Sequence, residues 1–149
     1  MSSQSAVDQF LAQKCLALAG ASRSGKKFGN TILKTLTDKA YDISPVHPEA
    51  SEIDGHKCYP TVSGLPSSVV GLVLVVPPNQ CEALVRQAVA AGIKNVWMQQ
   101  GSGSPEAVKL CQDNEINVVQ GQCILMFAQP TGVHKAHRWL LGLMGKLPE

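Results

Sequence analysis

The 149-residue sequence contains no apolar run that approaches the roughly 20 residues a membrane-spanning helix needs. Its first residues, MSSQSAVDQFLAQK, have no basic segment leading into an apolar core, so we expect no secretory signal peptide. A formal net charge of +2 is too small to indicate a nucleic-acid partner by itself. These absences favour a cytoplasmic protein with neither a nucleic acid nor a membrane as its partner.

The cysteines lack the spacing of a zinc site or a disulfide framework. There are five, an odd number, and no two follow the C-x-x-C pattern, which is typical of a protein from a reducing compartment. His56 and Cys58 have no second pair of ligands spaced to complete a site, so we predict no bound metal. Cys123 follows a predicted strand; we expect an inert thiol there, with a reactive one as the alternative. Inert thiols are also expected in apolar or helical contexts at Cys15, Cys81 and Cys111.

Strands and helices alternate along the chain. Short apolar segments predict strands at residues 15–19, 41–46, 69–76, 94–98 and 117–120. The third is almost wholly apolar, as a parallel strand buried on both faces should be. The short connections between strands and helices require right-handed crossovers. We therefore predict an α/β fold, a Rossmann-like doubly wound parallel sheet of about five strands in the order 3-2-1-4-5.

The helices have recognisable starts. Ser5 is the expected cap of a helix within residues 1–14, and Asn79 with Glu82 resembles a capping box for a helix that Gly92 ends. Ser104, followed by proline and an acid, is a typical helix start. The apolar residues of the helix after the first strand recur at helical spacing: Phe28, Ile32, Leu33 and Leu36. Residues 47–68 form a long loop, in which the CYPTV segment is expected to dock on the sheet.

The last residues, 131–149, predict an additional C-terminal helix with one apolar face and many basic residues. We expect this extension to pack on its own domain or on the partner in a homodimer. A metal pair at His134 and His137 and a membrane-surface helix are the alternatives. The whole chain, residues 1–149, is then a single domain.

The loop after the first strand carries the clearest sign of a ligand. Ligands of doubly wound sheets bind outside the carboxyl ends of the strands, and this strand is followed by GASRSGKKFGN. Glycines permit close backbone approach, and the start of the following helix favours an anion. Arg23, Lys26 and Lys27 add positive charge, which indicates a ligand with several phosphate charges; a merely solvated loop is the alternative.

The ends of the other strands narrow the choice of ligand. Pro77 and Pro78 form a rigid apolar wall suited to an adenine ring. Dinucleotide-binding enzymes place an acid after the second strand to bind the ribose, whereas this chain has His47 there. That substitution weakens an NAD assignment, although His47 could also be an ordinary turn residue. Gly101 is either a ligand-facing glycine or a turn glycine.

Five short motifs, in order along these strand ends, carry a resemblance to a known family. They are GAS at 20–22, VHP at 46–48, CYP at 58–60, VVPP at 75–78 and AGIKNVWMQQG at 91–101. From about residue 15 to 123 the chain resembles the small stand-alone CoA-binding proteins, a family similar to the CoA-binding domain of the succinyl-CoA synthetase α-subunit. The resemblance implies a Rossmann-like domain that binds coenzyme A, with the 20–29 loop at the phosphates and Pro77 and Pro78 near the adenosine.

Position by position, the pattern and the resemblance together predict which residues contact the cofactor. They are Gly20, Ala21, Ser22, Arg23, Lys26, Lys27, Phe28, Gly29, His47, Pro48, Val76, Pro77, Pro78, Gln99 and Gly101. The chain departs from the family pattern at three places. His47 replaces the usual asparagine, Glu49 stands where a basic residue is common, and residues 120–123 read QGQC where the family commonly has a sequence like Asp-Arg-Cys.

The residues show no nucleophile and base at persuasive spacing, so we predict no catalytic residues. We expect the chain to bind coenzyme A or an acyl-CoA as a non-catalytic module. One alternative is an NAD(P)-binding enzyme or redox sensor on the same fold. The other is a partner subunit that supplies the CoA site to an acyltransferase or acyl-CoA synthetase.

Overall fold

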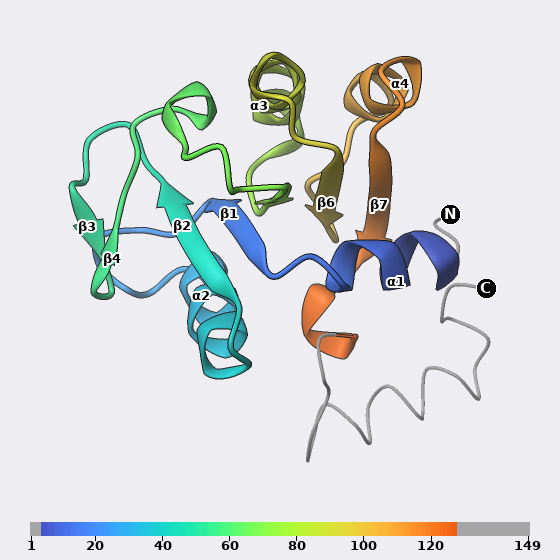
Figure 1. Cartoon of the computed structure of the whole chain (residues 1–149). Coiled ribbons are helices and arrows are strands. Elements are labelled where there is room, and N and C mark those ends of the chain that lie inside the picture. Colours follow the sequence, from blue (N-terminus) through green and yellow to red (C-terminus); the bar gives the residue numbers. More distant parts are fainter. Residues whose placement is uncertain (1–3, 128–149) are drawn as a thin grey trace.

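A five-stranded parallel sheet lies between two layers of helices in the computed structural model, which describes residues 4–127 (Figure 1). Its strands are β1 (Cys15–Ala19), β2 (Asp42–Val46), β5 (Gly71–Leu74), β6 (Asn95–Gln99) and β7 (Asn117–Gln122). One layer holds α1 (Gln4–Leu11), α2 (Phe28–Asp38) and the 3₁₀ turn η2 (Ile124–Met126). The other holds η1 (Val62–Gly64), α3 (Pro78–Ala91) and α4 (Pro105–Asp113). The predicted α/β class, the parallel pairing and the five strands are confirmed.

The predicted strand order is wrong. The observed order is β2-β1-β5-β6-β7, which is 2-1-3-4-5 when the sheet strands are numbered along the chain. The third strand, β5, pairs with β1, with Leu16 opposite Gly71, and not with the outer edge of β2. The sheet therefore has the other common doubly wound order, and its switch point lies between β1 and β5.

Pro45 gives a physical reason for this order. The predicted order required β2 to have a strand on each side, but a proline has no N–H for a second ladder and is confined to edge strands. In the structure Pro45 pairs with Leu18 on one side, and its carbonyl oxygen accepts the N–H of Tyr59 (3.0 Å) on the other. This docking of Tyr59 at the end of β2 confirms the expectation for the CYPTV segment. The apolar β5, buried along its whole length, takes the central place.

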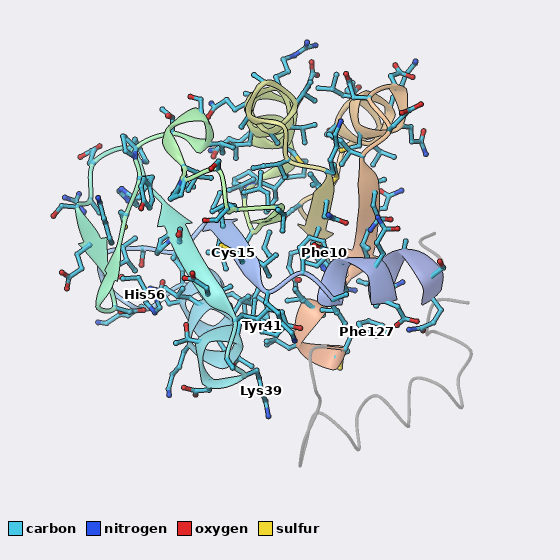
Figure 2. All side chains as sticks on the ribbon, in the orientation of Figure 1. Phe10, Cys15, Lys39, Tyr41, His56 and Phe127 are labelled. Atoms are coloured by element: carbon cyan, nitrogen blue, oxygen red, sulfur yellow. The ribbon has the colours of Figure 1, made fainter. Side chains whose placement is uncertain are left out.

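Alternating residues of the strands fill a core on each face of the sheet. On the α1 and α2 face, Trp97 is fully buried, with its ring centroid 5.4 Å from that of Phe10 and 6.0 Å from that of Phe127. Phe10 and Phe127 lie on this side of the sheet (Figure 2). Leu72, Leu74, Val85, Ala88, Val96 and Met98 belong to the core under α3 and α4. Trp97 is thus a core residue, as its context indicates.

The helix starts agree in part with the sequence. Ser104 caps α4, its hydroxyl accepting the N–H of Ala107 (3.1 Å), and Gly92 ends α3 with a left-handed backbone (φ +79°). Two predicted caps are wrong: Ser5 lies inside α1, and α3 starts at Pro78 with Pro77 as N-cap, so that Asn79 is already helical.

Between β2 and β5 the chain forms no α-helix. It makes a short hairpin of β3 (Glu52–Ile53) and β4 (His56–Lys57), passes Tyr59 and turns once through η1. Among residues 4–127, no helix is long and apolar enough to cross a membrane. The predicted C-terminal helix, with His134 and His137, lies outside the described residues.

Candidate ligand-binding site

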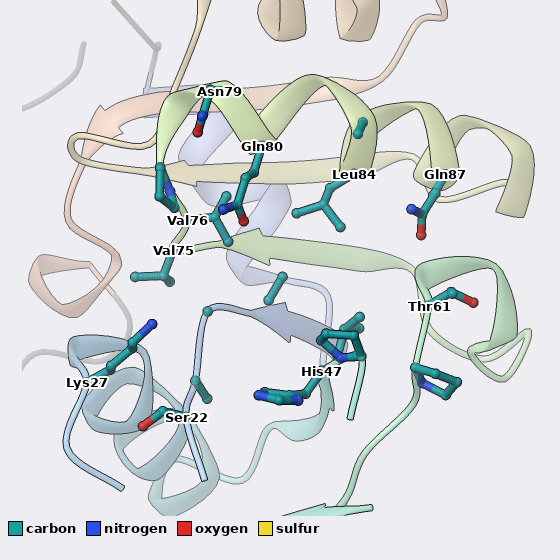
Figure 3. Close-up of a pocket in the computed structure, with 18 residues that line it drawn as sticks. Ser22, Lys27, His47, Thr61, Val75, Val76, Asn79, Gln80, Leu84 and Gln87 are labelled. Carbon is teal, nitrogen blue, oxygen red and sulfur yellow. The ribbon is translucent and has the colours of Figure 1, made fainter. Parts of the chain in front are cut away.

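A pocket of about 610 Å³ opens at the carboxyl ends of β1, β2 and β5, beneath α3 (Figure 3). Eight of the residues predicted from the sequence line it: Gly20, Ala21, Ser22, Lys27, His47, Pro48, Val76 and Pro77. Ten further lining residues were not predicted: Ala19, Val46, Pro60, Thr61, Val75, Asn79, Gln80, Ala83, Leu84 and Gln87. Its volume is that of a typical site for a small organic ligand.

The pocket has space along α3 because a loop, and not a helix, follows β2. Pro60 and Thr61 line the pocket, and Thr61 lies at the Gln87 end of α3 (Figure 3). The loop is attached to α3 by one hydrogen bond, in which the Val62 N–H donates to Gln87 Oε1 (3.0 Å). The Thr61 hydroxyl accepts the Gly64 N–H (3.2 Å) and so holds η1. The sequence predicted that the segment containing Pro60 and Thr61 docks on the sheet, but it did not place these residues in the site.

The loop between β1 and α2 is organised by one buried side chain, Asn30. Its Oδ1 accepts the backbone N–H groups of Ser22 (2.9 Å) and Lys27 (3.3 Å). Its Nδ2 donates to the Ser22 carbonyl oxygen (3.0 Å) and to Asp54 Oδ2 (2.9 Å) in the β3–β4 turn. A single amide therefore fixes both ends of the cationic loop and joins it to the hairpin. A polar residue within the apolar start of α2 was the available signal for this role.

Two glycines bring the backbone of this loop close to its neighbours. Gly20 has a φ of +123°, and a Cβ there would collide with the carbonyl oxygen of Val75. A Cβ on Gly29 would lie 2.5 Å from the carbonyl oxygen of Gly20. The first turn of α2 thus rests on the end of β1, beside the pocket. In a doubly wound sheet this is where the N-terminus of a helix can meet an anion.

The three loop cations have different surroundings. Lys27 is the only Lys, Arg, Asp or Glu among the pocket-lining residues that the structure describes. Arg23 lies 3.6 Å from the carboxylate of Glu49, and both side chains are mostly exposed. Lys26 is exposed and lies outside the pocket lining. The loop thus offers one cation to the pocket directly and a second that is partly neutralised by Glu49.

Several predicted residues lie outside the lining. The spacing predicted that Phe28 shares the buried face of Ile32, Leu33 and Leu36. Phe28 is instead 49% exposed. Gln99 is buried, and its Oε1 accepts the Ile124 N–H (3.0 Å), which is a structural role. Arg23, Lys26, Gly29, Pro78 and Gly101 are also outside it. Near Gly101, Ser102 Oγ accepts the Val76 N–H (3.1 Å) and so holds the end of β5.

His47 follows the last residue of β2 and forms part of the pocket wall opposite α3 (Figure 3). Its backbone N–H donates to the Tyr59 carbonyl oxygen (3.0 Å). Its ring nitrogen Nδ1 accepts the N–H groups of Glu49 (3.1 Å) and Ala50 (3.0 Å). The side chain thus makes the turn after β2, the way an asparagine oxygen makes an Asx-turn.

The cysteines are dispersed, and none lines the pocket. Burial raises the pKa of Cys81 to about 11 and, together with the neighbouring Cys81, that of Cys111 to about 12. Burial and the charge of Glu52 raise the pKa of Cys58. These three thiols are protonated at neutral pH, which makes them poor nucleophiles. Residues 4–127 contain no group of three or more His, Cys, Asp or Glu placed to hold a metal ion.

Among characterised proteins, the chain is similar to part of much longer ligases. It is 30% identical over 123 residues to acetate–CoA ligase [ADP-forming] I of Archaeoglobus fulgidus, covering 76% of this chain and 18% of the ligase. It is 33% identical over 81 residues to acetate–CoA ligase [ADP-forming] of Methanocaldococcus jannaschii, covering 54% of this chain and 12% of that ligase. The chain therefore spans less than a fifth of either ligase.

The solved structures that share the fold include a small protein and part of a larger enzyme. A conserved hypothetical protein from Pyrococcus furiosus is 40% identical, with a TM-score of 0.71, over 74% of this chain and 96% of that protein. An acetyl-coenzyme A synthetase from Ca. Korarchaeum cryptofilum is 28% identical, with a TM-score of 0.64, over 71% of this chain and 25% of that enzyme. Residues 14–129 match the family described as the CoA binding domain. The chain therefore belongs to the CoA binding domain family.

Proposed function

We propose that the chain binds coenzyme A, free or acylated, in the pocket beneath α3 and does not by itself transform it. The observation that carries this proposal is that one pocket is lined both by a glycine-containing loop suited to phosphates and by an apolar wall. Gly20, Ser22 and Lys27 lie at one side, next to the start of α2, and Val76 and Pro77 lie at the other. Family membership supports the same ligand class.

The residues present suit the charged part of this ligand. Coenzyme A carries a pyrophosphate and a 3′-phosphate, which a helix N-terminus and lysine side chains can bind. Lys27 lines the pocket and can contact a phosphate there, and Arg23 and Lys26 lie on the same loop. The hydrogen bonds of Asn30 hold this loop in one conformation, which lowers the entropy lost on binding.

The lining favours coenzyme A over a nicotinamide dinucleotide. An NAD site normally has an acidic side chain after the second strand to accept from the ribose hydroxyls. After β2 the pocket is lined by His47, and the nearest acid along the chain, Glu49, is exposed and paired with Arg23. Among the described lining residues no Asp or Glu is present, so this ribose acceptor has no counterpart here.

The chemistry of the lining supports a binding role. Its titratable side chains, within the described part of the chain, are Lys27 and His47. The Nδ1 atom of His47 accepts hydrogen bonds from two backbone N–H groups. It cannot accept a proton from a substrate unless these two hydrogen bonds break. The lining thus pairs no nucleophile with an available base.

A second function is favoured by the similarity to the ligases. The matched region makes up 18% of the Archaeoglobus ligase, so in that protein it is joined to further domains. We propose, as the alternative, that this chain supplies a CoA site to a separate acyl-CoA synthetase. Co-purification of a synthetase subunit, with activity that requires both chains, would favour this function over a free-standing module.

The test is a comparison of ligands by calorimetry at one salt concentration. CoA should bind best, dephospho-CoA more weakly and NAD least, with ATP as a further control. Changing Arg23, Lys26 and Lys27 together to Ala should weaken CoA binding by roughly three- to a hundredfold, since an exposed charge contact contributes about 0.2–1 kcal/mol. Lys34, Lys94 and Lys109, which lie outside the pocket, changed together to Ala, provide a control with the same change in charge. NAD binding more tightly than CoA would refute the proposal.

A further inference from the structure

The two ring nitrogens of His47 have different environments. Nδ1 accepts hydrogen bonds from the N–H groups of Glu49 (3.1 Å) and Ala50 (3.0 Å), so it carries no proton. In a neutral imidazole with an unprotonated Nδ1, the proton is on Nε2. The turn after β2 therefore fixes both the ring orientation and the tautomer, and it makes Nε2 a hydrogen-bond donor.

Nε2 has no hydrogen-bond partner among residues 4–127. Every buried side-chain nitrogen or oxygen in that part of the chain has a hydrogen-bond partner, so the unpartnered Nε2 is not a buried atom. The ring lies in the wall of the pocket, on the side opposite α3 (Figure 3). His47 is half-buried and lines the pocket, so its unpartnered Nε2 is accessible to a ligand bound there.

Three other polar side chains of the lining, those of Ser22, Thr61 and Gln87, already make hydrogen bonds within the protein. Ser22 Oγ lies 2.9 Å from Ser24 Oγ and 3.3 Å from Asn30 Oδ1. The Thr61 hydroxyl accepts from Gly64, and Gln87 Oε1 accepts from Val62. His47 differs from these residues because one nitrogen does the structural work and the other is left for a ligand.

We propose that His47 is a ligand-contacting residue whose Nε2–H donates to an oxygen of the sugar–phosphate part of the bound nucleotide. The inference rests on the proposed function and adds to it the atom that orients the ligand. A neutral ring contributes a directed donor without charge, so its effect is on orientation and selectivity more than on long-range attraction. Lys27 supplies the charge in the same pocket, and His47 supplies a fixed direction.

The two roles can be separated by substitution. In His47→Asn the side-chain oxygen can accept from the N–H groups of Glu49 and Ala50, as asparagine does in Asx-turns. Its amide nitrogen ends closer to the backbone than Nε2, so the donor at the position of Nε2 is absent. In His47→Ala both roles are lost. We expect His47→Asn to keep the wild-type melting temperature and to bind CoA about three- to tenfold more weakly, the value of one hydrogen bond. His47→Ala should lose affinity and also melt at a lower temperature.

Dephospho-CoA identifies which oxygen is bound. Equal losses for CoA and dephospho-CoA in His47→Asn would place the acceptor in the part that both share, and a loss for CoA alone would place it on the 3′-phosphate. A folded His47→Asn variant that binds both ligands within twofold of wild type would overturn the inference while leaving the proposed function intact. A wild-type protein that does not bind CoA would overturn both.

A measurement on the unmodified protein covers the case in which the variants do not fold. Nitrogen-15 spectra of the imidazole should show a proton on Nε2 in the free protein and a shifted Nε2 resonance on addition of CoA. A proton on Nδ1, or an Nε2 resonance unchanged at saturating CoA, would contradict the inference.

Discussion

A Cβ atom on Gly29 would lie 2.5 Å from the carbonyl oxygen of Gly20, so the start of α2 and the end of β1 meet backbone to backbone. The two glycines are nine positions apart and enclose the whole cationic loop. Their contact sets the distance between the first turn of α2 and the strand end that forms the floor of the pocket. No other residue type provides so close an approach.

We expect Gly29→Ala to destabilise the fold by about 1–3 kcal/mol, because the added methyl group must push two backbone segments apart. The measurement is the urea-induced unfolding free energy. Gly64→Ala is the matched control, since a Cβ there would lie 3.5 Å from Thr61 Oγ1, an ordinary contact. Equal stability of the two variants would show that α2 can shift away at little cost.

Asn30→Ala should lower stability by about 1–3 kcal/mol and also weaken CoA binding, because it leaves buried partners of the amide without hydrogen bonds. The partners are the backbone groups of Ser22 and Lys27 and the Asp54 carboxylate. Thermal unfolding and calorimetry measure the two effects. Asn79→Ala, at an exposed position of α3, should leave the stability unchanged. An Asn30→Ala variant as stable as wild type would contradict the role of this amide.

Glu49→Gln should raise the affinity for CoA by about 1.5- to fivefold at low salt, because the exposed carboxylate near Arg23 contributes about 0.2–1 kcal/mol of attraction that competes with the ligand. The gain should shrink at high salt, where such charges are screened. Glu115→Gln makes the same change in net charge outside the pocket and should have no such effect. A lower affinity in Glu49→Gln would mean that the ion pair holds Arg23 in its binding position.

The five cysteines should react with a maleimide in two groups at pH 8. Cys15 and Cys123 are half-buried, whereas Cys58, Cys81 and Cys111 are buried. With a pKa of about 11, only roughly one Cys81 thiol in a thousand is ionised at this pH. Mass spectrometry of the native protein should therefore find Cys15 and Cys123 labelled first, and all five labelled in urea. Early labelling of Cys81 would indicate opening of α3.

Much of the sheet could be predicted because its strands are short apolar segments with punctuated ends. The strand at Cys15–Ala19 has the predicted bounds, and the Ser104 cap and the Gly92 end follow from local chemistry that needs no distant partner. The apolar segment 69–76 contains β5 at Gly71–Leu74, shorter at both ends, because the flanking valines lie in the adjoining loops. Strand order depends on which distant segments pair, and here the proline of β2 was the one local clue.

The part of the site that lies on the β1–α2 loop and the β5–α3 turn was likewise visible in the sequence, because glycines, cations and prolines mark it. The wall formed by Pro60 and Thr61 was not, since only the docking of Tyr59 on β2 brings these residues to the pocket. Asn30 was missed because the presence of one polar residue in a helix does not show that its side chain makes five hydrogen bonds, to Ser22, Lys27 and Asp54. Gln99 was placed in the site by its strand-end position, but its side chain is used by Ile124.

The helix-free connection between β2 and β5 has an evolutionary consequence. This connection is attached to the sheet at Tyr59 and to α3 at Val62. Apart from Tyr59, none of residues 47–61 pairs with a strand of the five-stranded sheet. Ile53 and Cys58 are part of the core and Asp54 accepts from Asn30, but at the exposed positions of such a connection insertions and exchanges are tolerated far better than in a buried helix. Relatives can therefore diverge in ligand preference by remodelling residues 47–61, and grafting this segment between homologues is a direct way to transfer that preference.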